Sequence, residues 1–412
     1  MLSQEEKESI LKLTPFFSEN PVIFDVGSNK GHFTDLMLDE FGGGCDLHLF
    51  EPNQKLLSYT EIKYEYRKNI TYNCFALGRE KGEKDFYYFE NENNELSSLV
   101  KGDDWGELPM KVKTVGVDTV SRYVLIGRNI PVIDCLKIDC EGTDPDVVYG
   151  CKDMMRHGEI KFIIIEYSPH YNRADQQFKH VISAANAFGY KVYYYTSGNF
   201  WEVKIETFVE DYRFENFIIT KENIHNYSDG WNKEFVLNTI ELPKFEMVLE
   251  VGSFEGLTTR YMCDNLIENG RVVCVDPMKD YYTPEDTEHT EMFKQQYQRF
   301  CGNTRGLPIE LIRKESKDAL PELNALRFGL CYVDGDHRED AVYFDASWCF
   351  AITKIGGYIL FDDYGWRDET ARGIDRFLNE FGGSLEIVSK GYQVLVKKIS
   401  NQYNDLTYEY YK

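Results

Sequence analysis

Acidic residues flank a short glycine-containing loop near the start of the chain. Asp25 is followed by Val and then by Gly27-Ser-Asn-Lys-Gly31, and a second acid, Glu51, comes 24 residues after Gly27. The loop lacks the third-position glycine of G-x-G-x-x-G, which lets a backbone approach a pyrophosphate. An acid at the end of the first strand suits a cationic ligand instead. An acid at the end of the second strand can accept hydrogen bonds from both hydroxyls of a ribose.

The same arrangement occurs a second time in the C-terminal half of the chain. Glu250 is followed by Val and Gly252-Ser-Phe-Glu-Gly256, and Asp276 comes 24 residues after Gly252. A single offset of 225 residues relates both the glycines and the second acids to those of the first loop. Two landmarks in the same register indicate an internal duplication.

Acid, GxxxG and a second acid form the pattern of S-adenosylmethionine (SAM) sites in class I methyltransferases, which this sequence resembles twice. SAM carries an ammonium, a sulfonium and a ribose diol but no phosphate, so acids and a close backbone suit it. The resemblance implies two SAM sites. The candidate cofactor-binding residues are Asp25, Gly27, Asn29, Gly31 and Glu51 in the first copy and Glu250, Gly252, Ser253, Gly256 and Asp276 in the second.

The elements that must position these loops are apolar strands that alternate with amphipathic helical patterns. This alternation predicts an α/β fold with two tandem Rossmann-like, doubly wound sheets, each with an antiparallel strand pair at one edge. The runs GEKDFYYFE and KVKTVGVDTV make the first copy longer and are predicted to be added strands. We expect a first domain over 1–221, a linker with a lead-in helix over 222–243 and a second domain over 244–412.

Three more acids lie at predicted strand ends in the second copy. Asp334 ends one strand, and Asp362 and Asp363 end the next. Neighbouring parallel strands lie ~4.8 Å apart, so the three carboxylates can converge on one cation. Oxygen ligands predict Mg²⁺, with Mn²⁺ or Ca²⁺ as substitutes.

Several motifs of the first copy resemble FkbM-type methyltransferases. The matching runs are DVGSNKG, FEPN, SSL, LKIDCEG and IIIEY, while Thr143-Asp144 stands where the family usually has Ala-Glu. The resemblance implies O-methylation in glycan, lipopolysaccharide or natural-product pathways. It also places Lys137 at the reaction face, with Asp139, Glu141 and Glu166 as candidate catalytic residues.

The second copy resembles the macrocin-type, metal-dependent sugar O-methyltransferases. The matching runs are EVGSFEG, VVCVDP, VDGDH and GGYILFDDY, together with Asp345 in the helix after VDGDH. By this resemblance Asp336 is the general base, with His337 as the rival because a neutral imidazole can accept a proton near pH 7. Ser316 either borders the adenine or simply caps a helix.

The first copy has a weaker case for a metal. Asp139 and Glu166 occupy the repeat positions of Asp334 and Asp362, but Tyr167 replaces the second acid of the pair. Without a metal, Glu141, Glu166 or His170 is the expected base.

Composition limits the partners of the protein. The 412 residues include 69 acidic and 46 basic side chains, a net charge of -23, which opposes binding to nucleic acid. No apolar run is long enough for a membrane span, so we expect a cytoplasmic protein, with a homo-oligomer possible.

We expect a bifunctional O-methyltransferase acting on a carbohydrate or glycoconjugate. The alternatives are one catalytic domain joined to a binding or dimerisation module, a phenolic or catechol acceptor, and a nicotinamide-dependent oxidoreductase.

Overall fold

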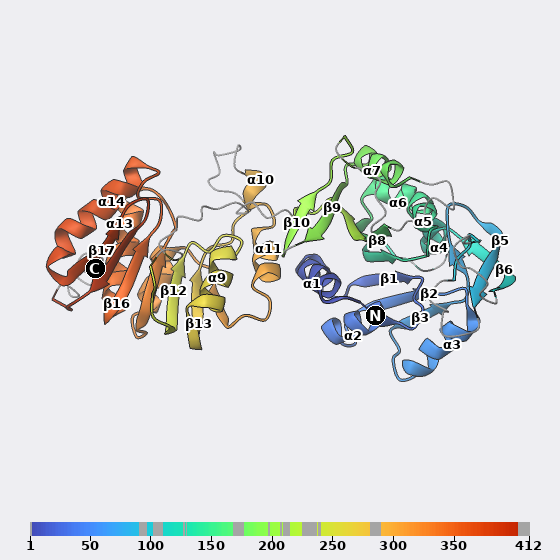
Figure 1. Cartoon of the computed structure of the whole chain (residues 1–412), viewed down its shortest axis with the longest axis horizontal. Helices are drawn as coiled ribbons and strands as arrows, with labels where there is room; N and C mark the ends of the chain where they lie inside the picture. Colours follow the sequence, from blue (N-terminus) through green and yellow to red (C-terminus); the bar gives the residue numbers. More distant parts are fainter. Residues whose placement is uncertain are drawn as a thin grey trace. The chain divides into compact units, whose positions relative to one another are not determined.

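The chain divides into two compact units, Met1–His225 and Asn226–Lys412. The computed structural model describes residues 2–89, 97–101, 110–126, 128, 130–167, 177–196, 198–206, 208, 215–224, 237, 240–280 and 290–402. His170 and most of the predicted linker lie outside these residues. Figure 1 colours the first unit blue to green and the second yellow to red.

The first unit is built on an eight-stranded sheet with the order β10-β9-β11-β8-β7-β1-β2-β3. The strands from β8 to β3 are parallel, while β11, β9 and β10 add antiparallel pairs at one edge. The strands are β1 (Val22–Val26), β2 (Asp46–Phe50), β3 (Ile70–Asn73), β7 (Ile133–Ile138), β8 (Ile160–Tyr167), β9 (Lys191–Thr196), β10 (Asn199–Glu202) and β11 (Glu215–Thr220).

Helices and a small second sheet complete this unit (Figure 1). The small sheet has the order β4-β6-β5 and contains the two strands predicted as additions to the first copy. Its strands are β4 (Ala76–Leu77), β5 (Gly82–Phe89) and β6 (Met110–Asp118). The helices are α1 (Gln4–Leu13), a 3₁₀ turn η1 (Thr14–Phe16), α2 (His32–Phe41), α3 (Gln54–Lys63), α4 (Val120–Leu125), α5 (Asp144–Gly150), α6 (Lys152–His157) and α7 (Phe178–Ala187).

The second unit repeats the topology with a seven-stranded sheet in the order β14-β13-β12-β15-β16-β18-β17. The strands are β12 (Phe245–Val251), β13 (Ile267–Val275), β14 (Ile309–Ile312), β15 (Phe328–Val333), β16 (Thr353–Phe361), β17 (Leu385–Lys390) and β18 (Val394–Lys398). The helices are α9 (Leu257–Asn265), α10 (Thr290–Phe293), α11 (Gln296–Asn303), α12 (Ser316–Glu322), α13 (Glu339–Ile352), α14 (Asp368–Phe381) and the 3₁₀ turn η4 (Gly382–Ser384).

The parallel strands are continuous apolar runs because helices cover both faces of each sheet. Ile163 in β8 and Ile359 in β16, for example, are fully buried in separate apolar cores. At one edge of the second sheet, β18 pairs antiparallel with both β16 and β17. The predicted fold class is therefore confirmed in both units. None of the helices in the described part of the chain is long and apolar enough to cross a membrane.

Candidate active sites

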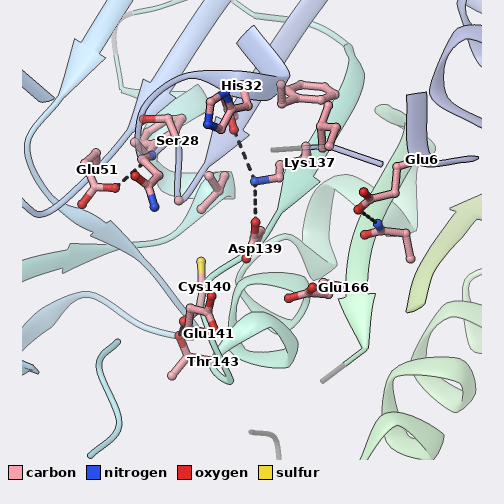
Figure 2. A pocket seen from close by; sticks show the side chains of 18 of the residues that line it. Glu6, Ser28, His32, Glu51, Lys137, Asp139, Cys140, Glu141, Thr143 and Glu166 are labelled. Atoms are coloured by element: carbon pink, nitrogen blue, oxygen red, sulfur yellow. Dashed lines mark hydrogen bonds and ion pairs between the residues drawn. The ribbon is translucent and has the colours of Figure 1, made fainter. Parts of the chain in front are cut away.

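A cavity of about 890 Å³ lies at the carboxyl ends of the parallel strands in the first unit. Most of the predicted site residues of the first copy line it. They are Asp25, Gly27, Asn29, Glu51, Asp139, Glu141 and Glu166. Figure 2 shows Glu51 on one side of Lys137 and Glu166 on the other. An open parallel sheet binds ligands at this edge, so the cavity has the expected place.

Asp25 lies at the floor of the cavity, where β1 ends. It is 1% exposed, and its Oδ2 accepts a hydrogen bond of 2.7 Å from the Thr34 hydroxyl. Its Oδ1 lies 3.7 Å from Lys137 Nζ and has no hydrogen-bond partner among the described residues. Burial raises the pKa of Asp25, and Lys137 opposes the rise. An unpartnered buried oxygen beside the cavity fits a ligand with N–H donors or a positive charge.

Gly27 and Gly31 have different roles in the loop after β1. Both have positive φ, 75° and 78°. A Cβ on Gly27 would lie 1.9 Å from the carbonyl oxygen of Asp139, so only glycine fits between the two loops. Gly31 precedes α2 as its N-cap and packs against Tyr64, whose hydroxyl donates to the Gly31 carbonyl over 2.8 Å. Gly31 therefore shapes the turn from outside the cavity lining.

Glu51, at the end of β2, is held by the backbone. Its Oε2 accepts a hydrogen bond from the amide of Asn29 (3.1 Å), and its Oε1 accepts one from the amide of Asn53 (2.8 Å). Burial raises the pKa of Glu51 to about 7, although these amides oppose the rise. Each carboxylate oxygen retains one lone pair without a partner among the described residues, which suits a diol.

The opposite side of the cavity carries the predicted catalytic acids. Lys137 Nζ lies 3.1 Å from Asp139 Oδ2 (Figure 2). Burial alone would lower the pKa of Lys137, but the carboxylates of Asp139 and Asp25 outweigh it and raise that pKa. Burial, followed by the charges of Asp139 and Glu141, raises the pKa of Glu166 well above its ordinary value.

Hydrogen bonds with two other residues hold the loop that carries Glu141 in place. Asp144 accepts hydrogen bonds from the amides of Cys140 (2.8 Å) and Gly142 (3.0 Å), and burial raises its pKa to about 7. The hydroxyl of Ser98, in the SSL run, donates to the Glu141 carbonyl over 2.9 Å. The departure from the family motif at Thr143-Asp144 thus leaves an acid that positions the loop.

The second unit repeats the cofactor loop in detail. Glu250 is fully buried, its Oε2 accepts a hydrogen bond from the Thr259 hydroxyl, and its Oε1 has no partner among the described residues. A Cβ on Gly252 would lie 1.9 Å from the carbonyl oxygen of Asp334, as at Gly27. Gly256, with φ 80°, is the N-cap of α9. Burial raises the pKa of Glu250 to about 7, with the Thr259 hydroxyl opposing the rise.

Asp276 is the counterpart of Glu51 and is more heavily bonded. Its Oδ2 accepts from the amides of Ser253 (3.1 Å) and Phe254 (2.9 Å). Its Oδ1 accepts from the amide of Met278 (2.7 Å) and the side-chain amide of Gln296 (3.1 Å). Burial raises the pKa of Asp276 despite these donors.

The structure brings two of the three predicted metal ligands, Asp334 and Asp363, together with His337. Ligand atoms of Asp334, His337 and Asp363 lie within 4.8 Å of one another. Asp362 instead accepts hydrogen bonds from the Tyr332 hydroxyl, from Gln393 (3.0 Å) and from the Asp363 amide (2.8 Å). Both aspartates follow the end of β16 at Phe361, and Asp363 has a positive φ of 55°.

The group of Asp334, His337 and Asp363 fits a divalent cation. His337 Nε2 lies 2.9 Å from Asp363 Oδ2 and 4.0 Å from Asp334 Oδ1. Burial and the neighbouring carboxylates of Asp362 and Asp363 raise the pKa of Asp334 well above its ordinary value. Two carboxylates and an imidazole form a donor set that suits Mn²⁺ and related ions as well as Mg²⁺.

Asp336 and Ser316 have partners that the sequence did not indicate. Asp336 forms a paired interaction with Arg338, with Nε at 3.0 and 2.9 Å from its two oxygens. Burial opposes the shift, but Arg338 lowers the pKa of Asp336, which makes it a weaker base than predicted. Ser316 is the first residue of α12, after the N-cap Glu315, and its hydroxyl faces the buried Asp345.

One register position distinguishes the two copies. In the first sheet Asp25 lies opposite Lys137, and in the second Glu250 lies opposite Tyr332. Lysine supplies a positive charge between Asp25 and Asp139, so the first site has an internal counterion. Tyrosine at the equivalent position supplies no positive charge to the acids of the second site, and a bound cation would compensate them.

Sequence reasoning missed the cavity residues that come from distant elements. Glu6 of α1 lines the cavity and accepts a hydrogen bond of 2.6 Å from Asn216 of β11, 210 residues away (Figure 2). Tyr194 and Tyr195 of β9 line the same side. The capping motif Ser3-x-x-Glu6 predicts the start of a helix but not where it docks.

Comparison with protein families assigns both units. Residues 25–192 match the family described as "Methyltransferase FkbM domain", and residues 249–364 match the family described as "Methyltransferase domain". The narrower macrocin-type assignment of the second copy stays a prediction.

Individual relatives are distant. The uncharacterised protein R132 of Acanthamoeba polyphaga mimivirus is 31% identical over 136 residues, 32% of this chain and 57% of that protein. The chain thus matches little more than half the length of this relative. Among solved structures, the O-methyltransferase TomG from Streptomyces achromogenes with SAM has a TM-score of 0.30 and 16% identity, over 38% of this chain and 74% of that one. An O-methyltransferase from Bacillus cereus with SAH has a TM-score of 0.28 and 19% identity, over 37% and 74%.

Proposed function

Because the chain carries an FkbM-type methyltransferase domain over residues 25–192 and a second methyltransferase domain over 249–364, we propose that it is a bifunctional SAM-dependent O-methyltransferase. Its acceptors are hydroxyls of a sugar or glycan, and its second domain uses a divalent metal. The observation that carries the proposal is the repeated pair of cofactor acids, Asp25 with Glu51 and Glu250 with Asp276. We propose domain boundaries at 1–221, 222–243 and 244–412, supported by the end of β11 at Thr220 and the start of β12 at Phe245.

The two pairs of acids fit the parts of SAM. The open oxygens of Asp25 and Glu250 can accept from its ammonium group, and Glu51 and Asp276 lie where a ribose diol would bind. No phosphate is needed, which agrees with loops lacking the dinucleotide glycine pattern. When bound, SAM supplies an electrophilic methyl group on a sulfonium.

In the first domain, the acceptor hydroxyl must lose its proton as its oxygen forms a bond to that methyl carbon and the carbon–sulfur bond breaks. Glu166 lines the cavity and is the proposed base: with a pKa raised to about 9 its ionised form is the minor one near pH 7 but a stronger base than an ordinary glutamate. Lys137 offsets part of the negative charge of Asp139 and Asp25, which weakens the case for a metal in this domain.

In the second domain, Asp334, Asp363 and His337 would hold the cation. A divalent ion there would lower the pKa of an acceptor hydroxyl, which is otherwise about as weak an acid as water. Asp336 lies in the same loop and remains a candidate base, but its pairing with Arg338 must open first. The hydroxyl of Tyr392 donates to Asp363 over 2.9 Å and helps to orient it.

The walls of the first cavity favour a hydroxyl-rich acceptor without phosphate. Glu5, Glu6, Glu141 and Glu166 line it together with tyrosines, and Lys137 is already paired with two acids. Carboxylates accept hydrogen bonds from sugar hydroxyls, whereas they repel phosphate. A neutral or positively charged carbohydrate therefore fits better than a heavily phosphorylated one.

The proposal is tested by methyl transfer from labelled SAM to a panel of mono- and oligosaccharides. We expect EDTA, or Asp334→Ala, to abolish one of two methylation products and leave the other. We expect Asp25→Ala to abolish the other product. Asp340→Ala, at an exposed acid near the start of α13, is the matched control and should change neither.

Calorimetry with S-adenosylhomocysteine (SAH) on the full chain should show two sites. Absence of any SAH binding would overturn the proposal. If the Asp334→Ala variant methylates every acceptor hydroxyl as fast as the unmodified chain does, the metal-dependent part of the proposal is wrong.

A further inference from the structure

The two acids expected to bind the ribose differ in how many of their lone pairs are already used. Among the described residues, the carboxylate of Glu51 accepts two hydrogen bonds, one on each oxygen. The carboxylate of Asp276 accepts four, two on each oxygen. A carboxylate offers about four lone-pair sites, so Asp276 has none left for a ribose hydroxyl.

Three of the four donors to Asp276 are backbone amides in the loops that shape the site. Two of them correspond to the donors on Glu51, because Phe254 and Met278 are offset by 225 residues from Asn29 and Asn53. The side chain of Gln296 is the donor that can leave without moving the backbone. The Gln296 amide donates to Oδ1 of Asp276. The corresponding lone pair, on Oε1 of Glu51, has no donor among the described residues.

Gln296 is held in place by the helix that it begins. It is 2% exposed and is the first residue of α11. The same helix is hydrogen-bonded to the loop Gly252–Gly256. Arg299 Nε donates to Glu255 Oε2 (3.0 Å), and Asn303 donates to the Glu255 carbonyl (2.8 Å). These contacts therefore hold the Gln296 side-chain amide in its hydrogen bond with Asp276.

We infer that Gln296 competes with the cofactor ribose for Asp276 and makes the second SAM site the weaker of the two. This inference rests on the proposed function, since it takes SAM as the ligand of both sites. At limiting SAM the first domain fills first. The second domain fills only when the ribose displaces the Gln296 amide, so Gln296 sets the cofactor concentration at which both reactions run.

The test is a calorimetric titration of the full chain with SAH. The chain carries Glu51→Ala, so that binding at the second site is measured without binding at the first. Gln296→Leu removes the donor at similar volume, and Gln296→Met removes it at similar length. A hydrogen bond to a charged group is worth enough for both variants to tighten SAH binding about tenfold or more. Gln298→Leu, on the same helix and not tied to Asp276, is the control and should leave the affinity unchanged.

The possible results distinguish failure of this inference from failure of the proposed function. Unchanged or weaker SAH binding in both Gln296 variants, with the control unchanged, would overturn the competition and make Gln296 a positioning residue. If Gln296→Leu binds weakly but Gln296→Met binds tightly, lost packing explains the leucine variant and the inference stands. If the unmodified chain binds no SAH, the proposed function fails and the inference fails with it.

Discussion

Lys137 and Tyr332 occupy equivalent register positions, and this one difference changes the electrostatics of the two sites. Lys137 contacts Asp25 and Asp139, whereas the Tyr332 hydroxyl donates a hydrogen bond to Asp362. A buried carboxylate needs a partner, and each copy supplies a different one. The two sites thus share a backbone but differ in the residue that faces the first acid.

Glu51 predicts a pH dependence for cofactor binding in the first domain. Burial raises its pKa from 4.5 to about 7, and the ribose hydroxyls need the ionised form as their acceptor. SAH affinity at this site should therefore rise between about pH 6 and 8, by up to tenfold per unit below the pKa. Calorimetry in an Asp276→Ala background measures it.

Two variants separate this effect from other titrating groups. Glu51→Gln should bind SAH more weakly at pH 8 and lose most of the slope, while Glu61→Gln on the exposed face of α3 should retain both. A slope that persists in Glu51→Gln would assign the titration to another group. The sign for folding is opposite: because the carboxyl of Glu51 loses its proton near pH 4.5 in the unfolded chain but near pH 7 in the folded one, the ligand-free protein becomes less stable as pH rises from about 4.5 to about 7.

Helix α1 forms part of the wall of the first cavity. Ser3 and Glu6 form a capping box at its start, Glu6 also binds Asn216, and Lys12 donates to the Gly198 carbonyl. These contacts tie the helix to β11 and to the turn after β9. The helix therefore closes the cavity from one side.

Loosening α1 should affect the acceptor more than the cofactor. Ser3→Ala removes a cap worth about 1 kcal/mol, and Glu6→Ala removes the reciprocal hydrogen bond to the Ser3 amide and the contact to Asn216. We expect both to raise the KM of the first reaction several-fold, with Glu6→Ala the stronger, while SAH affinity stays the same. Hydrogen exchange should quicken in α1, and Glu8→Ala should behave as the unmodified protein. A change in SAH affinity alone would contradict this role.

The sequence was informative where chemistry depends on local spacing. The glycine loops and the acids at strand ends were predicted because an internal repeat fixes their register, and the alternation of strands and helices fixed the fold class. Contacts between distant elements could not be read in this way, so Glu6 with Asn216 was missed. Asp362 was predicted as a metal ligand from its place after a strand, and its hydrogen bonds with Tyr332 and Gln393 come from distant elements that local spacing does not reveal.

The two units bury separate cores, so we expect them to unfold with separate transitions. Ile163→Ala in β8 and Ile359→Ala in β16 each remove a fully buried side chain from one core and should cost about 2–5 kcal/mol. For units of this size each kcal/mol corresponds to about 2–4 °C. Calorimetry should show that each variant shifts a different transition, and a joint shift in both variants would show that the units unfold together.

At Gly27 and Gly252 the loop that binds the cofactor touches the loop that carries the reactive acids, with no room for a methyl group between them. A substitution that moves one loop must therefore move the other. Attempts to engineer a new acceptor preference through the loops after β7 or β15 would damage cofactor binding at the same time. In the first domain, α1 and β9 line the acceptor side without sharing that backbone contact. Libraries confined to these two elements are the better route to altered specificity.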